Sequence, residues 1–590
     1  MNGDSGVVTE RRARAGRAIA GLFCAAILLK LGLEQTVLRN GRLELAKRII
    51  PSPRAFDPGP GPICASGGEH LADSVVRYTV WVDPAAYSSD EDRERVASKL
   101  APATGVTCGR VLAEVSRPNS RFRHIARRAD RATAERVANL DLPGVHIKEE
   151  IGRTYPFARL AANALGCRGV ENEGLEGVEA LWAFALDGYA GSRPVDRDYS
   201  GRRILGIPER GAPPEPGDRL ILTLRLPLQR VVEAAMDDLW TKNQPESATC
   251  TVLDPRTGDI LALSVRPNFD PANLRQAMPE ERKCRQSFDV YPPGSTLKTV
   301  IVAAALDAGV ITESSRFYCP GTVEVGKKPL GCWGEWRTKG HGWLTPDDVI
   351  AKSCNVCAAE IAMRLGADRL YRFLDRMQLQ ETLCSGLDGE RAGIVLPKSE
   401  QRIRGIANIG FGQGIDVTDL HMLAWYGALA NEGRMYRPNI VREVRRADGR
   451  LVGSREPTLL GQLYKPKSAR LALRFLEHAV ENGTGATAKI EGVRVGGKTG
   501  TAQIYDPATG QHLDEYIMSF IAVAPIEAPR FVVFVRVVRP KVGEHGSDTA
   551  APVAKRVLEA AINLSAAELA GEQPTVEVAG RTAPDAQDPS

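Results

Sequence analysis

The spacing of apolar and polar residues along the chain predicts strands and helices in alternation rather than one repeated element. Regular alternation of apolar and polar side chains indicates a strand, and a longer stretch rich in Arg, Ala and Glu favours a helix. On these patterns we expect strands at 75–82, 220–226, 248–253 and 260–265, and helices at 91–100, 132–140 and 228–239. They predict an α/β (α+β) protein whose second half begins with a hairpin.

One apolar run near the start of the chain differs from everything after it. Residues 18–33 are apolar except for Lys30, and four arginines lie within 11–17. A cleaved signal peptide and a buried helix are alternatives, but no A-x-A-like cleavage site follows and no helical periodicity interrupts the run. We expect an uncleaved, single-pass transmembrane helix at 18–38, with the arginines on the cytoplasmic side.

Clusters of Pro and Gly divide the rest of the chain. Such clusters occur at 51–62 and 206–217 and read as irregular connectors. The expected segments are a cytoplasmic tail at 1–17, the anchor at 18–38, an exported N-terminal domain at 39–217, a second domain at 218–564 and a disordered tail at 565–590.

Composition and charge exclude several classes of protein. The 590 residues are 43% apolar and 25% charged, which is ordinary for globular domains and too polar for a polytopic membrane protein. Because 77 basic residues nearly balance 72 acidic ones, nucleic acid is not an expected partner. The 11 cysteines are too few for a disulfide scaffold.

The first stretch that carries chemistry is Tyr291-Pro-Pro-Gly-Ser-Thr-Leu-Lys298, followed by an apolar run that predicts a helix at 299–308. Ser295 is then expected at the start of this helix, where free N–H groups favour negative charge. Lys298 lies three residues later on the same helical face. A serine hydroxyl becomes a good nucleophile when a neighbour takes its proton, and a lysine does so when burial lowers its pKa.

Two further motifs follow in order, and together with the first they indicate a function that the first motif alone does not. Ser353-Cys-Asn355 precedes a predicted helix at 356–365, and Gly496-Gly-Lys-Thr-Gly-Thr-Ala-Gln503 has small residues that let a strand edge approach a ligand. Taken singly, these are ordinary helix starts and a Gly-rich strand. Together, S-x-x-K, S-x-N and K-T-G form the ordered set of serine β-lactamases and penicillin-binding proteins.

On these motifs the chain resembles the class B penicillin-binding proteins, which are monofunctional peptidoglycan D,D-transpeptidases. Further support comes from the segments 254–270, 412–418 and 482–485, and from Arg153-Thr-Tyr-Pro156 and 174–179 in the N-terminal domain. The resemblance implies an elongated α+β pedestal domain of the dimerisation type at 39–217. It also implies a serine β-lactamase/transpeptidase-like domain at 218–564, with a central antiparallel sheet flanked by helices.

The resemblance also implies a catalytic role for each motif residue. Ser295 would be the acylated nucleophile and Lys298 its general base, while Ser353 relays a proton and Asn355 holds the substrate amide. Lys498, Thr499, Gly500 and Thr501 would bind the terminal carboxylate and help form the oxyanion hole. No cofactor is required for this chemistry.

Partners and location follow from the same resemblance. The expected substrates are peptidoglycan stem peptides on lipid-linked or nascent glycan, and β-lactams are the expected inhibitors. Asn355 and the segments 412–418, 515–525 and 539–541 resemble division-type (septal) enzymes more than elongation-type ones. Such an enzyme sits in the cytoplasmic membrane with its catalytic domain outside, beside a polytopic glycan polymerase and other division proteins. A β-lactam sensor or hydrolase and an inactive division scaffold are the alternatives.

Three cysteines and one histidine lie between or within the first two motifs. Cys319, Cys332, His341 and Cys354 are a plausible tetrahedral set for a structural zinc ion, although their spacing lacks a C-x2-C pair. The resemblance adds to this, since some class B enzymes place zinc at matching positions. A Cys319–Cys332 disulfide and free buried thiols are the alternatives, and Cys357 is a substitute ligand.

Overall fold

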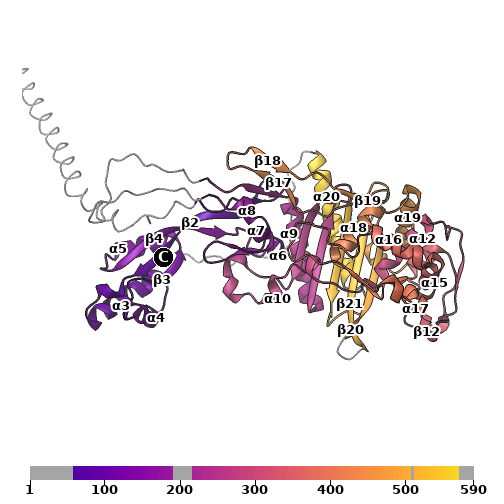
Figure 1. The fold of residues 1–590 in the computed structure, drawn as a ribbon, viewed down its shortest axis with the longest axis horizontal. Coiled ribbons are helices and arrows are strands. Elements are labelled where there is room, and N and C mark those ends of the chain that lie inside the picture. Colours follow the sequence, from indigo (N-terminus) through magenta and orange to yellow (C-terminus); the bar gives the residue numbers. More distant parts are fainter. Residues whose placement is uncertain (1–57, 190–214, 507–510, 571–590) are drawn as a thin grey trace, which may run out of the picture. The chain divides into compact units, whose positions relative to one another are not determined.

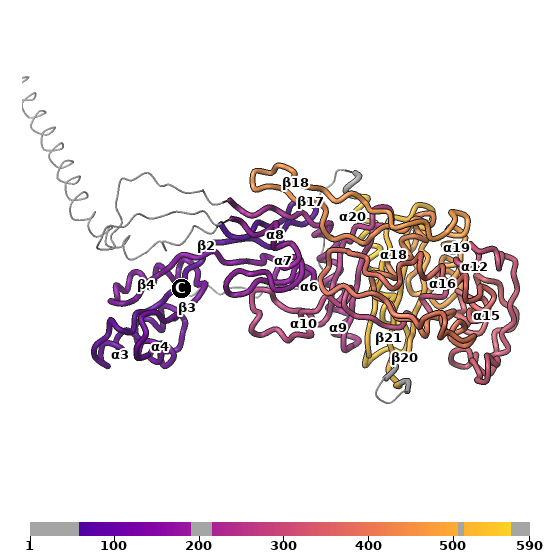
Figure 2. The backbone as a smooth tube through the Cα atoms, viewed as in Figure 1, coloured from indigo at the N-terminus to yellow at the C-terminus, as the bar shows by residue number. Residues whose placement is uncertain are grey.

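Each of the two folded units of the chain is built around a β-sheet. The computed structural model describes residues 58–189, 215–506 and 511–570 (Figures 1 and 2). In these ranges no helix is both long and apolar enough to cross a membrane. The anchor expected at 18–38 and the cytoplasmic tail at 1–17 lie outside them.

The smaller unit includes residues 74–152 and places three helices against strands β2, β3 and β4. Strand β2 is paired on both sides, by β3 and by β4. Its elements are β2 (His70–Val82), α3 (Asp90–Thr104), α4 (Cys108–Val115), β3 (Arg123–Ala129), α5 (Arg131–Asn139) and β4 (Val145–Thr154). The strand expected at 75–82 and the helices expected at 91–100 and 132–140 are therefore present. Ser89 caps the N-terminus of α3: its side chain accepts a hydrogen bond from Asp92 N, and three acidic residues occupy the first turn.

The larger unit also contains part of the predicted N-terminal domain, namely residues 59–73 and 153–188. Strand β1 (Ile63–Cys64) runs parallel to β7 (Arg219–Leu222), which pairs with β17 (Val441–Arg445). Buried side chains of β1 and β7 share one hydrophobic core. Strand pairing across the boundary expected at 217/218 therefore joins residues of both expected domains in a common sheet.

An antiparallel five-stranded sheet in the order β20-β21-β22-β8-β9 forms the centre of the larger unit. The strands are β8 (Ser247–Leu253), β9 (Ile260–Arg266), β20 (Gly496–Asp506), β21 (Gln511–Ala524) and β22 (Phe531–Val538). Two separate hydrophobic cores cover its two faces, one with α9 and α20 and the other with α12, α15, α18 and α19. Because both faces are buried, β22 is almost continuously apolar rather than alternating.

The helices of these two layers are α9 (Leu226–Asn243), α12 (Leu297–Asp307), α15 (Asn355–Leu365), α18 (Asp419–Ala430), α19 (Pro466–Asn482) and α20 (Ala550–Ala570). Two predicted boundaries are wrong here. The strand expected at 220–226 ends at Leu222, because Pro227 starts helix α9 at Leu226. The tail expected to be disordered from 565 is helical to Ala570, because the Ala-rich end of α20 continues the helix and buries Ser565.

Shorter elements complete the larger unit and connect these layers. They are β5 (Cys167–Arg168), β6 (Gly174–Glu176), α6 (Ala162–Leu165), α7 (Gly177–Leu181), α8 (Ala183–Leu186), α10 (Pro279–Arg282), α11 (Arg285–Phe288), β10 (Phe317–Cys319), β11 (Thr322–Val325), β12 (Lys328–Gly331), α13 (Trp336–Lys339), β13 (Gly342–Leu344), α14 (Pro346–Ala351), α16 (Ala367–Arg376), β14 (Ile394–Val395), α17 (Ile403–Ile409), β15 (Ile415–Asp416), β16 (Arg434–Tyr436), β18 (Leu451–Ser454) and β19 (Leu459–Gln462).

Candidate active site

Ser295 lies in a single 3-10 turn, Gly294–Thr296, that leads directly into α12. Gly294 has φ +56, and its N–H donates to Gly412 O at 3.0 Å. A Cβ atom on Gly412 would lie 1.9 Å from Gly294 O, so only glycine allows the two backbones to approach this closely. The serine is therefore held at the start of a buried helix, as the motif predicts.

Lys298 is fully buried, and its Nζ atom is surrounded by oxygen atoms. Nζ lies 2.9 Å from Ser295 Oγ, 3.1 Å from Ser353 Oγ, 2.6 Å from Ser353 O and 2.7 Å from Asn355 Oδ1. An ammonium group has only three hydrogens for these four oxygens. The carbonyl and amide oxygens can only accept, so a neutral amine can donate to them and turn its lone pair to a serine hydroxyl.

Ser353 joins the two lysines of the site. It lies between α14 and α15 in the left-handed region, with φ 54, a conformation that is uncommon and strained for a residue other than glycine. Its Oγ is 3.1 Å from Lys298 Nζ and 3.0 Å from Lys498 Nζ. The hydroxyl thus forms a bridge along which a proton can move between the first and third motifs.

The third motif lies on β20, which is the edge strand of the central sheet. The Nζ atom of Lys498 also donates to Thr499 O at 2.9 Å and contacts Thr499 Oγ1 at 3.3 Å. A Cβ atom on Gly500 would lie 2.2 Å from Ser519 Oγ and 3.0 Å from Thr296 Cγ2. Glycine at 500 therefore lets β20 pack closely against the turn that carries Ser295.

Thr501 lies one residue further along β20 and is exposed. A Cβ atom placed on Gly294 would lie 3.2 Å from Thr501 O, so the strand passes directly beside the Ser295 turn. The residues predicted to catalyse and to bind substrate, Ser295, Lys298, Ser353, Asn355, Lys498, Thr499, Gly500 and Thr501, are thus gathered at one place by α12, α15 and β20.

Burial shifts the pKa values of both lysines downward. The pKa of Lys298 is lowered to about 8, chiefly because the charged amine is removed from water. Burial and the nearby charge of Lys298 lower the pKa of Lys498 well below its usual value. In the described part of the chain neither lysine forms an ion pair with a carboxylate. An amine in these surroundings can accept a proton near neutral pH.

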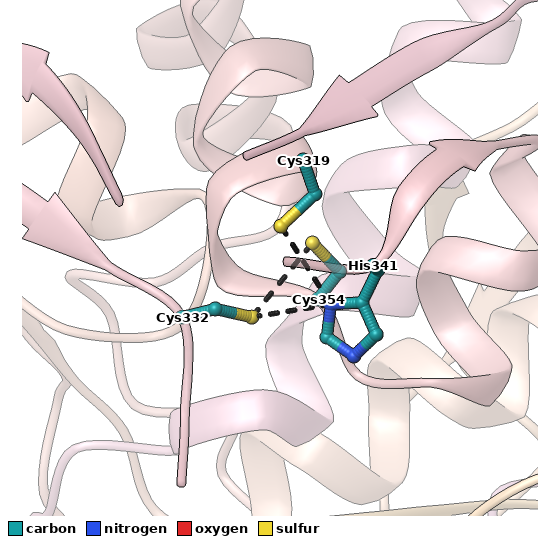
Figure 3. Close-up of side chains that lie close together, drawn as sticks. All are labelled: Cys319, Cys332, His341 and Cys354. Atoms are coloured by element: carbon teal, nitrogen blue, oxygen red, sulfur yellow. Dashed lines mark hydrogen bonds between the residues drawn. The ribbon is translucent and has the colours of Figure 1, made fainter. Parts of the chain in front are cut away.

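The cysteines and the histidine predicted as metal ligands also come together (Figure 3). His341 Nδ1 lies 3.6 Å from Cys319 Sγ and 3.5 Å from Cys332 Sγ, and Cys332 Sγ lies 3.9 Å from Cys354 Sγ. All four donor atoms are within 4.8 Å of one another. No disulfide joins these cysteines, so the alternative Cys319–Cys332 disulfide is not formed. Cys357 is buried but is not among these ligands; its N–H donates to Cys354 Sγ at 3.5 Å.

Two contacts at the site were missed by reasoning from the sequence. Thr484 Oγ1 lies 2.9 Å from Thr499 Oγ1, and Tyr426 donates its hydroxyl hydrogen to Thr296 O at 2.7 Å. Thr484 belongs to the segment 482–485, which supports the resemblance but predicts no contact. Tyr426 lies in an apolar helix, α18, where its pattern indicates only the core.

Comparison with known proteins shows which domains the chain contains. Residues 248–559 match the penicillin-binding protein transpeptidase domain, and residues 56–222 match the penicillin-binding protein dimerisation domain. The chain is 31% identical over 536 residues to stage V sporulation protein D of Bacillus subtilis, covering 90% of this chain and 82% of the relative. It is 30% identical over 510 residues to peptidoglycan D,D-transpeptidase FtsI of Escherichia coli, covering 84% and 81%.

Solved structures show the same fold. Penicillin-binding protein 2X of Streptococcus thermophilus superposes with a TM-score of 0.72 at 24% identity, covering 87% of this chain and 80% of that one. Penicillin-binding protein 3 of Mycobacterium tuberculosis, solved with aztreonam, gives 0.67 at 23% identity, with 87% and 97% covered. With a dimerisation domain ahead of a transpeptidase domain, the chain belongs to the class B penicillin-binding proteins.

Proposed function

We propose that this protein is a peptidoglycan D,D-transpeptidase that crosslinks stem peptides through an acyl-enzyme on Ser295. The observation that carries the proposal is the position of Lys298 Nζ, which is 2.9 Å from Ser295 Oγ and has no carboxylate partner among the described residues. A buried amine of lowered pKa at hydrogen-bond distance is what a general base for serine requires.

In the first step, Ser295 Oγ attacks the carbonyl carbon of the penultimate D-alanine while Lys298 accepts the hydroxyl proton. Backbone N–H groups of Ser295 and Thr501 stabilise the oxyanion. Ser353, bridging the two lysines, returns a proton to the nitrogen of the departing D-alanine. The positive potential of Lys498 and the hydroxyls of Thr499 and Thr501 hold the terminal carboxylate, and Asn355 orients the peptide amide.

In the second step, the amine of another stem peptide attacks the acyl-enzyme, Lys298 accepts the proton of the amine and passes it to Ser295 Oγ, and the C–O bond to Ser295 breaks. A β-lactam presents the same carbonyl and carboxylate but keeps its leaving group tethered by the ring. We therefore expect β-lactams to acylate Ser295 and to remain bound.

Covalent labelling tests the proposal directly. Wild-type protein, Ser295→Ala and a matched control, Ser314→Ala, which alters an exposed serine elsewhere, are incubated with a fluorescent penicillin. The labelled peptide is then mapped by mass spectrometry. We expect stoichiometric, slowly released label on the wild type and the control, and none on Ser295→Ala. Label at another residue contradicts the proposal, and fast release supports the alternative hydrolase.

We further propose that the enzyme serves division rather than elongation. The proposal rests on the sequence resemblance of Asn355 and the segments 412–418, 515–525 and 539–541 to division-type enzymes. Depletion of the protein in its native cell should then block septation and leave filaments or chains. Cells that instead lose their shape while still dividing would support the elongation-type alternative.

The location that we propose is the cytoplasmic membrane, with a single anchor at 18–38 and an exported catalytic domain. The substrate class supports this, because nascent peptidoglycan exists only outside the membrane. A polytopic glycan polymerase is the proposed partner in the membrane. Fractionation of the full chain and of a chain beginning at residue 39 should place only the former in the membrane.

We propose, finally, that Cys319, Cys332, His341 and Cys354 bind a structural zinc ion. Zn–S bonds of about 2.3 Å in a tetrahedral site place ligand atoms about 3.8 Å apart. The distances of 3.9, 3.6 and 3.5 Å between donor atoms fit such a site. The ion would tie the loops around β10 and β13 to Cys354, the middle residue of the second motif.

Metal analysis with cobalt substitution tests the zinc proposal without reference to activity. We expect one zinc per chain, and a thiolate-to-metal absorption band after exchange with Co²⁺. Cys332→Ser should lose most of the metal, whereas the matched control Cys357→Ser, which alters a buried thiol outside the cluster, should keep it. Metal-free protein after metal-replete purification, or equal loss in both variants, contradicts the proposal.

A further inference from the structure

A fully buried arginine lies beneath the segment that leads to Ser295. Arg536, on β22, is 2% exposed and donates through Nε to Asp419 Oδ1 at 2.7 Å. Asp419 is completely buried at the start of α18. Thr249, which pairs with Arg536 across the strands, donates to Asp419 Oδ2 at 2.6 Å. The carboxylate is thus held from two neighbouring strands.

The same guanidinium also binds the chain just before the first motif. Its Nη2 donates to Arg285 O at 3.3 Å, its Nη1 donates to Asp289 Oδ2 at 3.2 Å, and its Cζ atom lies 4.5 Å from the ring centre of Tyr291. Three points of the segment 285–291 are therefore attached to one side chain, and Ser295 follows four residues later.

The backbone of this segment is tied to the start of α18 as well. Tyr291 and Val417 exchange two hydrogen bonds, at 3.0 and 2.8 Å, and Asp419 lies two residues after Val417. Arg536 therefore links both partners of this bridge, one through Tyr291 and one through Asp419. Displacement of the guanidinium would therefore loosen both partners of this bridge, Tyr291 and Val417, next to the turn that carries Ser295.

Stability alone does not explain an ion pair at this place. Burying two charges opposes folding through desolvation, and apolar residues of similar volume often replace a buried pair without loss of stability. The surrounding β22 is apolar on both faces, so a hydrophobic pair would suit the core. What an apolar pair could not supply is directional hydrogen bonding from one side chain to two separate chain segments, 285–291 and the start of α18, at once.

We propose that Arg536, with Asp419 and Asp289, is a positioning group that sets the placement of Ser295 and thereby the rate of its acylation. The inference rests on the proposed function of Ser295. It concerns residues outside the three motifs. In the proposed mechanism these residues act through the segment 285–291 and do not touch the substrate.

The test measures the kinetics of acylation by a fluorescent penicillin, so that the affinity of the initial complex is separated from the rate constant of acylation. The melting temperature of each variant is measured as well. The variant is the double substitution Arg536→Met/Asp419→Leu, which removes both charges and so leaves no isolated one. The matched control is Arg266→Met/Glu233→Leu, since Arg266 is also buried and lies 2.8 Å from Glu233. All acylation rate constants are measured on the folded fraction of each variant, below its melting temperature.

We expect the Arg536 double variant to acylate at least tenfold more slowly with nearly unchanged initial affinity, and the control to stay within twofold of wild type. A merely structural role would change the melting temperature and leave the acylation rate constant alone. Rates within twofold of wild type for both double variants, or equal losses in both, overturn the inference.

A milder variant keeps the inference testable if the double variant does not fold. Asp289→Asn weakens the link between Arg536 and the segment without stranding a buried charge, because Asp289 is 20% exposed. Asp237→Asn, which alters a carboxylate beside Arg266, is its control. We expect about threefold slower acylation for Asp289→Asn only, and an unchanged rate overturns the inference. If wild-type protein itself is not labelled at Ser295, the proposed function fails instead.

Discussion

Two buried cationic centres in the larger unit differ in what surrounds them. Lys298 and Lys498 are ringed by hydroxyl, carbonyl and amide oxygens, and burial lowers their pKa values. Burial also opposes the charge of Arg536, but Asp419 and Asp289 outweigh it and raise its pKa. The interior therefore holds one centre whose protons can leave and another whose charge is permanent.

The choice of side chain follows the same division. A lysine amine loses its proton when it is desolvated, and this makes it useful as a base. The guanidinium stays charged in proteins and presents five donors in a rigid plane, so it suits the task of holding several acceptors. In the mechanism that we propose, the lysine centre transfers protons and the arginine centre fixes the geometry.

Removal of the proposed base, Lys298, should lower the acylation rate more than any other change to the two centres. In Lys298→Ala the hydroxyl of Ser295 loses its proton acceptor, and we expect acylation by penicillin to fall about a thousandfold. The matched control is Lys352→Ala, since Lys352 is next to Ser353 but its side chain is 47% exposed. Comparable loss in both variants, measured by stopped-flow fluorescence, would argue against Lys298 as the base.

A carboxylate placed beside Lys298 should make the lysine centre resemble the arginine centre. Asn355→Asp puts a negative charge near the position of Oδ1, 2.7 Å from Nζ, and should raise the pKa of Lys298 by roughly one to three units. We expect at least tenfold slower acylation at pH 7 and a pH profile displaced upward. Asn355→Ala serves as the control, which removes the same hydrogen bond without adding charge. An unmoved midpoint in Asn355→Asp would contradict the assignment.

The pH dependence of the wild type follows from the same pKa. Because the pKa of Lys298 is lowered to about 8, the neutral base is the minor form below that pH. The acylation rate should rise about tenfold per pH unit up to about pH 7 and level off above pH 8. A flat profile between pH 6 and 8, in protein shown to be folded throughout by circular dichroism, would mean that another group accepts the proton.

The smallest expected effect is that of Thr484, which contacts Thr499 next to Lys498. Its substitution tests whether neutral hydrogen bonds around the lysines also position the site. Thr484→Val removes the hydroxyl 2.9 Å from Thr499 Oγ1 and should slow acylation by about threefold to tenfold, the effect of one hydrogen bond. Thr484→Ser, which keeps the hydroxyl, should remain close to wild type. If both variants match the wild type, Thr484 does not position Thr499.

Much of the candidate site could be predicted from short motifs, because each motif carries its own local geometry. A spacing of three residues in a helix places Lys298 beside Ser295, and small residues around Lys498 indicate a strand edge with room for a ligand. Tyr426, Thr484 and Arg536 gave no such signal. Their partners lie 130, 15 and 117 residues away, and local patterns carry no information about such pairs.

The amino-acid sequence by itself determined the motifs, the helices and strands that carry them, and the family to which the chain belongs. Local hydrogen bonding and the period of the apolar residues are enough for that. Only the tertiary structure decided that residues 59–73 and 153–188 pack with the larger unit, that three scattered cysteines and one histidine come together, and which buried cation keeps its proton. The physical reason is that burial and the charge of distant neighbours depend on how segments far apart in the chain pack together.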